Sequence, residues 1–196
     1  MNETPLTREK ILEVAEDVLL RYGPSKATVI DVARALGVSH GSVYRHFASK
    51  AELRNAVLNR WLTRLIEPLE SIVRRDASAE DRLYCWLKEI IAIKRQRLED
   101  VPELFAAYVE LSAEAGEAIE KHMGKMIDLV RRILAEGVSR GEFQMEDSTL
   151  TARAILIATS RFHHPAHKQE WASPSIDADF EAVWALLLNG LTSHKR

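Results

Sequence analysis

Apolar residues recur along most of the chain at the three- and four-residue spacing of an amphipathic α-helix. No alternation typical of a strand persists beyond a few residues, and the eight glycines and six prolines stand mainly at breaks between helical segments. We therefore expect an all-α fold of about nine helices.

Polar signals mark the expected helix starts in the first part of the chain. Thr28, with Asp31 three residues later, is typical of a helix start, and Ser39 is placed to cap a short helix after it. The segment Ser49 to Glu52 is typical of a capping box that opens a further helix. This last helix is expected to continue to about residue 75, with a kink or break near Pro68.

Beyond a short polar break at residues 76–80 the helices become longer. They are expected over residues 79–100, 102–115, 117–140, 148–162 and 177–193. The pattern predicts one domain over residues 1–50 and a longer helical domain over residues 51–196, with a helix at 51–75 connecting the two.

The charge distribution points to nucleic acid, although the net charge of −2 does not. Between Arg21 and Arg60 seven basic residues stand against two acidic ones, a net charge of +5 that leaves −7 for the rest. A compact basic segment on an acidic chain is typical of a nucleic-acid-binding module, although a solvated surface can have the same pattern.

The remaining composition excludes several classes of protein. The single Cys85 excludes an internal disulfide and a cysteine zinc site. The first residues carry acids where a signal peptide would need basic residues, and no apolar stretch approaches the ~20 residues of a membrane span. We expect a cytoplasmic protein with no cofactor, no bound metal and no membrane contact.

Residues 28–47, TVIDVARALGVSHGSVYRHF, predict two short helices joined by a tight turn at Gly37. Val38, Val43 and Phe47 are spaced to pack inward, which leaves the polar residues of the second helix facing outward. This is the plan of a helix-turn-helix, whose second helix enters the major groove of DNA.

This stretch, with the opening helix ILEVAEDVLLRYG and the capped segment ASKAELRNAV, resembles the TetR family of transcriptional regulators over about residues 7–60. The resemblance implies a helix-turn-helix DNA-binding domain over residues 1–50, whose third helix reads DNA. It also implies a ligand-binding and dimerisation domain over residues 51–196. That later part is similar to the family only in its helix count and in the Gly-Glu-Phe segment from Gly141 to Phe143.

Nine residues are candidate DNA contacts by position and side-chain type: Thr28, Ser39, His40, Gly41, Ser42, Tyr44, Arg45, His46 and Lys50. Thr28 and Ser39 start helices whose free amides favour phosphate, although both could serve as caps alone. The resemblance implies a phosphate contact for Tyr44 rather than half-buried packing. Lys50, in the first turn of its helix, combines charge and helix dipole for the same purpose.

Base contacts are expected from His40, Ser42 and Arg45, with Gly41 allowing the backbone a close approach. Arg45 could donate two hydrogen bonds to guanine or could bind a phosphate instead. His46 could contact the DNA backbone or remain solvated.

The helices nearest the end of the chain carry long apolar faces, formed by Leu150, Ala154, Leu156, Ile157, Phe180, Val183, Trp184, Leu187, Leu188 and Leu191. These faces are expected to form a four-helix interface between two subunits, with a buried core as the alternative. A homodimer would match a palindromic double-stranded DNA operator.

A mixed apolar pocket for a small-molecule effector could be lined by Trp86, Phe105, Tyr108, His122, Met126, Phe162 and His163. Ordinary core packing is the alternative for each of them.

The neighbouring His163, His164 and His167 could share a metal ion, but Pro165 breaks the spacing of a helical pair. The chain lacks a phosphate-binding glycine loop, a nucleophile elbow and an HExxH motif, so we do not expect an enzyme. The function predicted is that of a ligand-responsive repressor that binds its operator as a homodimer and is released by a small molecule. A DNA-binding protein without an effector, or a helical enzyme using the histidine cluster, are the alternatives.

Overall fold

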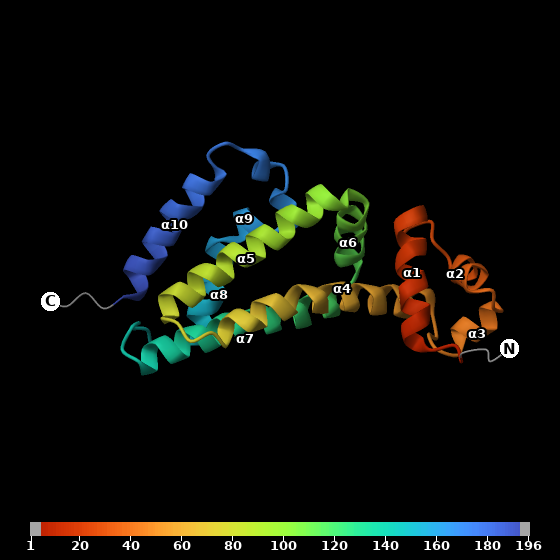
Figure 1. Cartoon of the computed structure of the whole chain (residues 1–196), viewed down its shortest axis with the longest axis horizontal. Coiled ribbons are helices and arrows are strands. Elements are labelled where there is room, and N and C mark those ends of the chain that lie inside the picture. The colour runs from red at the N-terminus through yellow and green to blue at the C-terminus, as the bar shows by residue number, and fades with distance from the viewer. Residues whose placement is uncertain (1–4, 193–196) are drawn as a thin grey trace. The chain divides into compact units, whose positions relative to one another are not determined.

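The structure, a computed structural model, describes residues 5–192 of the chain (Figure 1). Within this range all regular structure is helical, with ten α-helices and two short 3₁₀ helices, so the all-α prediction is confirmed. None of the helices in the described range is long and apolar enough to cross a membrane.

The chain divides into two compact units. Unit 1 contains the described residues up to Thr63 and the segment Asp100–Glu120, and unit 2 contains Arg64–Glu99 and the described residues from Lys121 onward. These units divide the chain differently from the predicted domains at 1–50 and 51–196, which remain a prediction.

Unit 1 is built from α1 (Arg8–Tyr22), α2 (Val29–Leu36), α3 (His40–Tyr44), the first part of α4 (Lys50–Val73) and α6 (Pro102–Glu114), with the first turn of α7 (Figure 1). Its core is formed by buried apolar residues of the first four helices and of the turn after α3, among them Ile11, Ala15, Val32, Val43, Phe47, Val57 and Trp61. Their helical spacing is the pattern that predicted these helices.

The ends of the short helices follow the predicted signals. The Thr28 hydroxyl accepts a hydrogen bond from the Asp31 amide at 3.2 Å, and Asp31 accepts one from the Thr28 amide at 3.0 Å, so the capping box is complete. Gly37 ends α2 with φ of 69°, in the left-handed region that favours glycine. The Ser39 hydroxyl caps α3 by accepting from the Ser42 amide at 3.2 Å. These caps fix the angle at which α3 leaves α2.

Unit 2 contains the rest of α4, α5 (Ala79–Asp100), most of α7 (Gly116–Ser139), α8 (Ser148–Ala158), α9 (Ser160–His163) and α10 (Ile176–Leu191). The 3₁₀ helices Pro165–His167 and Glu170–Ala172 lie between α9 and α10. The six α-helices of this unit all contribute to one apolar core. Its most buried members include Leu69, Trp86, Leu87, Val130, Ile133, Ile155 and Phe180.

One of the expected helices is interrupted in the structure, and another is continuous where a kink or break was expected. The helix expected over residues 148–162 is broken at Thr159, whose buried hydroxyl donates to the Ile155 carbonyl at 2.8 Å and competes with the helical hydrogen bonds. Helix α4 is continuous through Pro68, so there is no break at that residue, and a kink there stays a prediction. The end expected at residue 193 for the last helix lies outside the described residues.

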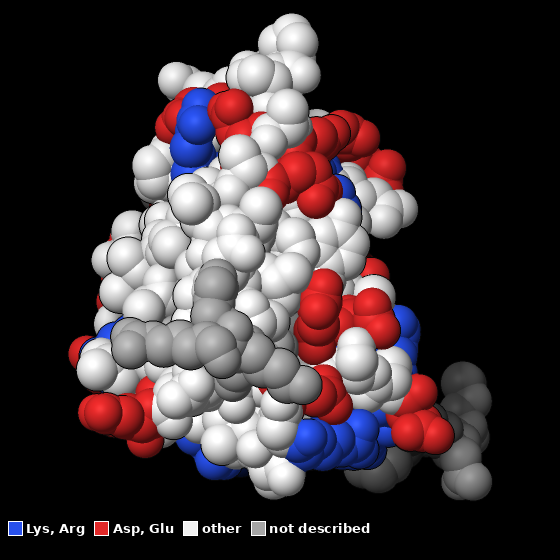
Figure 2. Space-filling view, turned by 90° about the vertical axis from the view of Figure 1, so that its left-hand side faces the viewer, with Lys and Arg blue, Asp and Glu red and all other residues white. Residues whose placement is uncertain are grey.

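The predicted dimer seam is only partly available at the surface. Four of its ten residues are buried in the core of unit 2, as the alternative to a dimer interface predicted: Leu156, Phe180, Trp184 and Leu191. Large apolar side chains remain exposed nearby, with exposed fractions of 64% for Leu150, 67% for Ile157 and 74% for Leu186. Figure 2, seen from the side on which α10 ends, shows uncharged residues over much of the face and both acidic and basic residues toward its edges.

Candidate nucleic-acid interface and interior polar cluster

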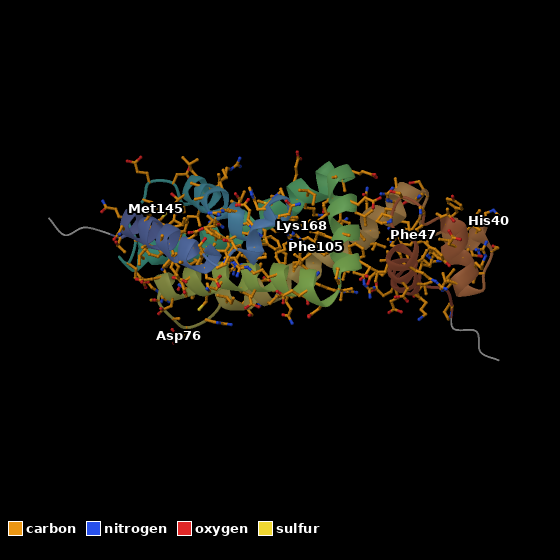
Figure 3. All side chains as sticks on the ribbon, turned by 90° about the horizontal axis from the view of Figure 1, so that it is seen from above. His40, Phe47, Asp76, Phe105, Met145 and Lys168 are labelled. Carbon is orange, nitrogen blue, oxygen red and sulfur yellow. The ribbon has the colours of Figure 1, made fainter. Side chains whose placement is uncertain are left out.

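The outward face of α3 presents most of the predicted base-contacting residues to solvent. His40, Tyr44 and Arg45 are exposed, and Ser42 is half-buried. Figure 3 shows His40 at the outer edge of the helix-turn-helix, whereas Phe47 lies among the helices. A short helix that is held by buried side chains on one face and presents polar side chains on the other can enter a major groove.

The polar side chains of α3 are bonded to one another. The Ser39 and Ser42 hydroxyls lie 2.9 Å apart, and Arg45 Nη2 donates to Ser42 Oγ at 3.1 Å. The rings of His40 and Tyr44 meet edge to face at 6.4 Å between centroids. Arg45 therefore keeps several N–H groups available for a base or a phosphate while one is held by Ser42.

The structure brings two predicted phosphate contacts together. Thr28 and Lys50 both line a hollow between α1, α2 and α4 whose other lining residues are mostly apolar, and Lys50 Nζ donates to the Ser25 carbonyl at 3.3 Å. The Thr28 hydroxyl and amide are held by Asp31, and the hydrogen bond from that hydroxyl lowers the pKa of the Asp31 carboxyl.

Arg8 is a residue of this surface that the sequence did not predict. Its guanidinium lies 4.0 Å from the centroid of the Phe47 ring, donates to the His46 carbonyl and pairs with Glu52 at 3.0 Å. Arg8 thereby ties the start of α1 to the residues that follow α3. No local spacing signals this contact, since its partners lie some forty residues away.

Helix α6 is attached to the helix-turn-helix side of unit 1 by two acidic residues. Glu110 accepts a hydrogen bond from the Ser25 hydroxyl, and Glu114 pairs with Arg54 at 2.9 Å. Ser25 precedes the Thr28 cap by three residues. Helix α6 therefore contacts the segment that leads into the capping box of α2.

The seven predicted pocket residues are distributed over both units. Phe105 and Tyr108 lie on α6 in unit 1, with ring centroids 6.2 Å apart. The other five lie in unit 2, where Trp86, Met126 and Phe162 belong to the apolar core.

Inside unit 2 lies an interior polar cluster formed by Lys94, His122, Thr159 and His163. The exposed fractions of Lys94, His122 and His163 are only 5%, 8% and 9%. Burial and then the charge of Lys94 lower the pKa of His122 to about 4 and that of His163 to about 3. Both imidazoles are therefore neutral at physiological pH, beside a buried ammonium group.

The three neighbouring histidines are not gathered around a common point. His163 Nε2 lies 3.3 Å from the Thr159 hydroxyl, His164 Nδ1 accepts from the Ala166 amide, and His167 Nδ1 lies 2.7 Å from Glu170. Among residues 5–192 no three metal-binding side chains are grouped so as to hold an ion.

Comparison with known proteins identifies both parts of the chain. Residues 11–57 match the family of bacterial regulatory proteins of the tetR type, and residues 79–184 match the tetracyclin repressor-like C-terminal domain. The HTH-type transcriptional regulator TtgR of Pseudomonas putida is 28% identical over 80% of this chain and 77% of that protein. The HTH-type transcriptional repressor BepR of Brucella suis is 27% identical over 80% of this chain and 78% of that protein.

Solved structures share the fold. SmeT, the repressor of a Stenotrophomonas maltophilia multidrug efflux pump, superposes with a TM-score of 0.69 at 19% identity, covering 97% of this chain and 92% of that one. FadR of Bacillus subtilis, in complex with stearoyl-CoA, superposes with a TM-score of 0.65 at 19% identity, covering 94% and 99%. The second family match alone spans more than half of the sequence. The chain belongs to the TetR family and is a DNA-binding transcriptional regulator, as its helix-turn-helix predicted.

Proposed function

We propose that this regulator represses transcription by binding a palindromic operator as a homodimer, and that a small-molecule effector releases it. The observation on which this depends most is the outward face of α3, where His40, Tyr44 and Arg45 are exposed above the buried Val43 and Phe47. The similarity to proteins named as repressors, BepR and SmeT, supports repression rather than activation.

The nine predicted DNA contacts fall into two groups in this proposal. Arg45, Ser42 and His40 contact base edges, with Gly41 allowing α3 to approach. Thr28, Ser39, Tyr44, His46 and Lys50 position the protein on phosphates. The position of the Lys50 ammonium, which donates to the Ser25 carbonyl three residues before the Thr28 cap, supports the second group.

Two copies would meet through α8 and α10. The exposed apolar residues Leu150, Ile157 and Leu186 support this, since side chains of this size are costly to leave in water. Two helices from each subunit would form a four-helix interface and set the recognition helices one helical turn of DNA apart, about 34–36 Å, or a multiple of it.

Effector binding in the C-terminal domain would favour a dimer whose α3 helices no longer match that spacing. Helix α4 contributes to both units, and α6 contacts the segment that leads into the α2 cap through Glu110 and Ser25, so both are suited to transmit the change. The solved complex of FadR with stearoyl-CoA, a protein of the same fold, supports the presence of an effector site.

The test begins with selection of an operator from random duplex DNA by the full-length protein. The affinity of wild type for that operator is then compared with Arg45→Ala and with Arg75→Ala, a matched change at an exposed arginine of unit 2. Loss of base contacts worth about 1–3 kcal/mol predicts at least fivefold weaker binding for Arg45→Ala alone. Unchanged affinity and selectivity of Arg45→Ala in a gel shift, or failure to enrich any palindromic sequence, would contradict the proposal.

A further inference from the structure

Three nitrogen-bearing side chains are buried inside unit 2, where the charge of Lys94 reaches both His122 and His163, although the core of this unit is otherwise apolar. Lys94 comes from α5, His122 from α7 and His163 from α9, and each is more than nine-tenths buried. A lysine at this depth is rare in a protein core, because its ammonium group loses the hydration that stabilises its charge.

The cluster has a positive electrostatic character. The charge of Lys94 acts on both imidazoles and, with burial, lowers the pKa of His122 and His163. It also contributes to the lowered pKa of His164. A negatively charged group placed here would be attracted by Lys94 and would make protonation of the neighbouring imidazoles more favourable.

One polar atom of the cluster has no partner. His122 Nδ1 is buried and makes no hydrogen bond, whereas His163 Nε2 lies 3.3 Å from the Thr159 hydroxyl. Buried polar atoms in proteins are nearly always satisfied by a protein group, by water or by a ligand. The ring of His122 is therefore a place where a ligand atom would complete a hydrogen bond.

Apolar side chains adjoin the cluster on each helix. Ile90 lies one turn before Lys94 on α5, Met126 lies one turn after His122 on α7, and Phe162 directly precedes His163 on α9. All three belong to the hydrophobic core of unit 2. A ligand that placed a charged group at the cluster would have hydrocarbon around the rest of its body.

We propose that Lys94 and His122, with His163 beside them, bind the carboxylate of a small organic acid with an apolar body, and that such an acid is the effector of this regulator. A carboxylate accepts charge-assisted hydrogen bonds from an ammonium group and from an imidazole N–H, and its charge offsets that of the buried lysine. This inference rests on the proposed function, in which a small molecule bound in the C-terminal domain releases the operator.

Binding is tested on the full-length protein with acids and neutral molecules of matched shape. Laurate is paired with 1-dodecanol and 2-naphthoate with 2-naphthalenemethanol, and affinities are measured by titration calorimetry and by the shift of the thermal midpoint. At least one acid is expected to bind tenfold or more tightly than its neutral partner. Failure of both acids to bind, or equal binding of the neutral partners, would overturn the inference.

The lysine is tested with a control on a neighbouring helix. Lys94→Met keeps the length of the side chain and removes its charge, and it should weaken binding of the preferred acid at least tenfold. Lys125→Met, an exposed lysine whose charge also reaches His122, should change the affinity less than twofold. Equal affinity of Lys94→Met and wild type refutes the site.

Separate measurements distinguish a misfolded variant and a failed operator from the loss of acid binding. Circular dichroism and operator affinity show whether Lys94→Met is folded. If it is not, His122→Leu replaces it and should likewise bind the preferred acid at least tenfold more weakly. Acid affinity of His122→Leu equal to that of wild type would refute the site. Release of the operator by neutral compounds only would overturn the anion site and leave the proposed function standing. Absence of any operator would overturn the proposed function, whereas calorimetry of acid binding needs no DNA.

Discussion

Gly137 on α7 is predicted to be a position where one added methyl group destabilises the protein. A β-carbon built there would lie 2.5 Å from Cδ2 of Phe143 and 2.7 Å from the β-carbon of Ala79. Both distances are shorter than real contacts allow, and both neighbours are buried, with exposed fractions of 3% and 0%. Gly137→Ala therefore requires the Phe143 ring and the start of α5 to shift.

The magnitude follows from two opposing effects. Replacing glycine by alanine inside a helix stabilises it by about 1 kcal/mol, whereas an additional carbon in a tightly packed core costs about 1–3 kcal/mol. Gly124, exposed on the same helix with no atom within 4 Å of an added β-carbon, would show the helix effect alone. The difference between Gly137→Ala and Gly124→Ala is then the packing cost, about 1–3 kcal/mol.

The assay is thermal unfolding followed by circular dichroism at equal protein concentration. For a chain of this size 1 kcal/mol corresponds to about 2–4 °C in midpoint, so Gly137→Ala should melt at least about 2 °C below Gly124→Ala. Gly124→Ala should melt at or slightly above wild type. A Gly137→Ala midpoint equal to or above that of Gly124→Ala would refute the close packing between α7, Phe143 and Ala79.

Three further predictions concern the cap of α2, the buried histidines and the surface of α10. Thr28→Ala removes both hydroxyl contacts of the capping box and should lower stability by about 1 kcal/mol in urea unfolding; no change would contradict the role of the cap. In the folded protein the pKa values of His122 and His163, about 4 and about 3, lie below that of an unfolded histidine. The unfolded chain therefore takes up protons at a pH where the folded chain does not. The free energy of unfolding should be highest above about pH 6.5 and fall toward pH 4. Each histidine can contribute up to about 1.4 kcal/mol per pH unit to the slope of unfolding free energy against pH, and His122→Gln should reduce the total slope. A slope equal to that of wild type would disprove the lowered pKa of His122. Leu186→Glu, at a side chain 74% exposed, should shift the protein from dimer to monomer in light scattering while the helical circular dichroism spectrum at 25 °C stays unchanged, and a persistent dimer would exclude α10 from the interface.

Local chemistry allowed much of unit 1 to be predicted from the sequence. The starts of α2 and α3 at Thr28 and Ser39, and the turn at Gly37, depend on residues within three or four positions of one another, and the structure has each of them as expected. The same holds for the inward positions of Val43 and Phe47.

The features that the sequence did not predict depend on distant partners. Arg8 contacts residues near 46–52, and Glu110 contacts Ser25, so no periodic pattern marks either pair. The burial of Lys94 is not predictable from the sequence, because a lysine within a helix usually faces solvent, whereas this one occupies an interior position. His122 and His163 were predicted as pocket residues one by one, but their common neighbour was not.

The construction of α3 has a consequence for altering which DNA sequence the protein selects. The helix is only five residues long, and it is fixed by the Ser39 cap, by the buried Val43 and, through Phe47, by Arg8. None of these anchors is one of the exposed side chains at positions 40, 44 and 45. Positions 40 and 45, which the proposal assigns to base contacts, are therefore open to randomisation as a small library, in which new operator preferences could be sought without redesigning the scaffold that holds them.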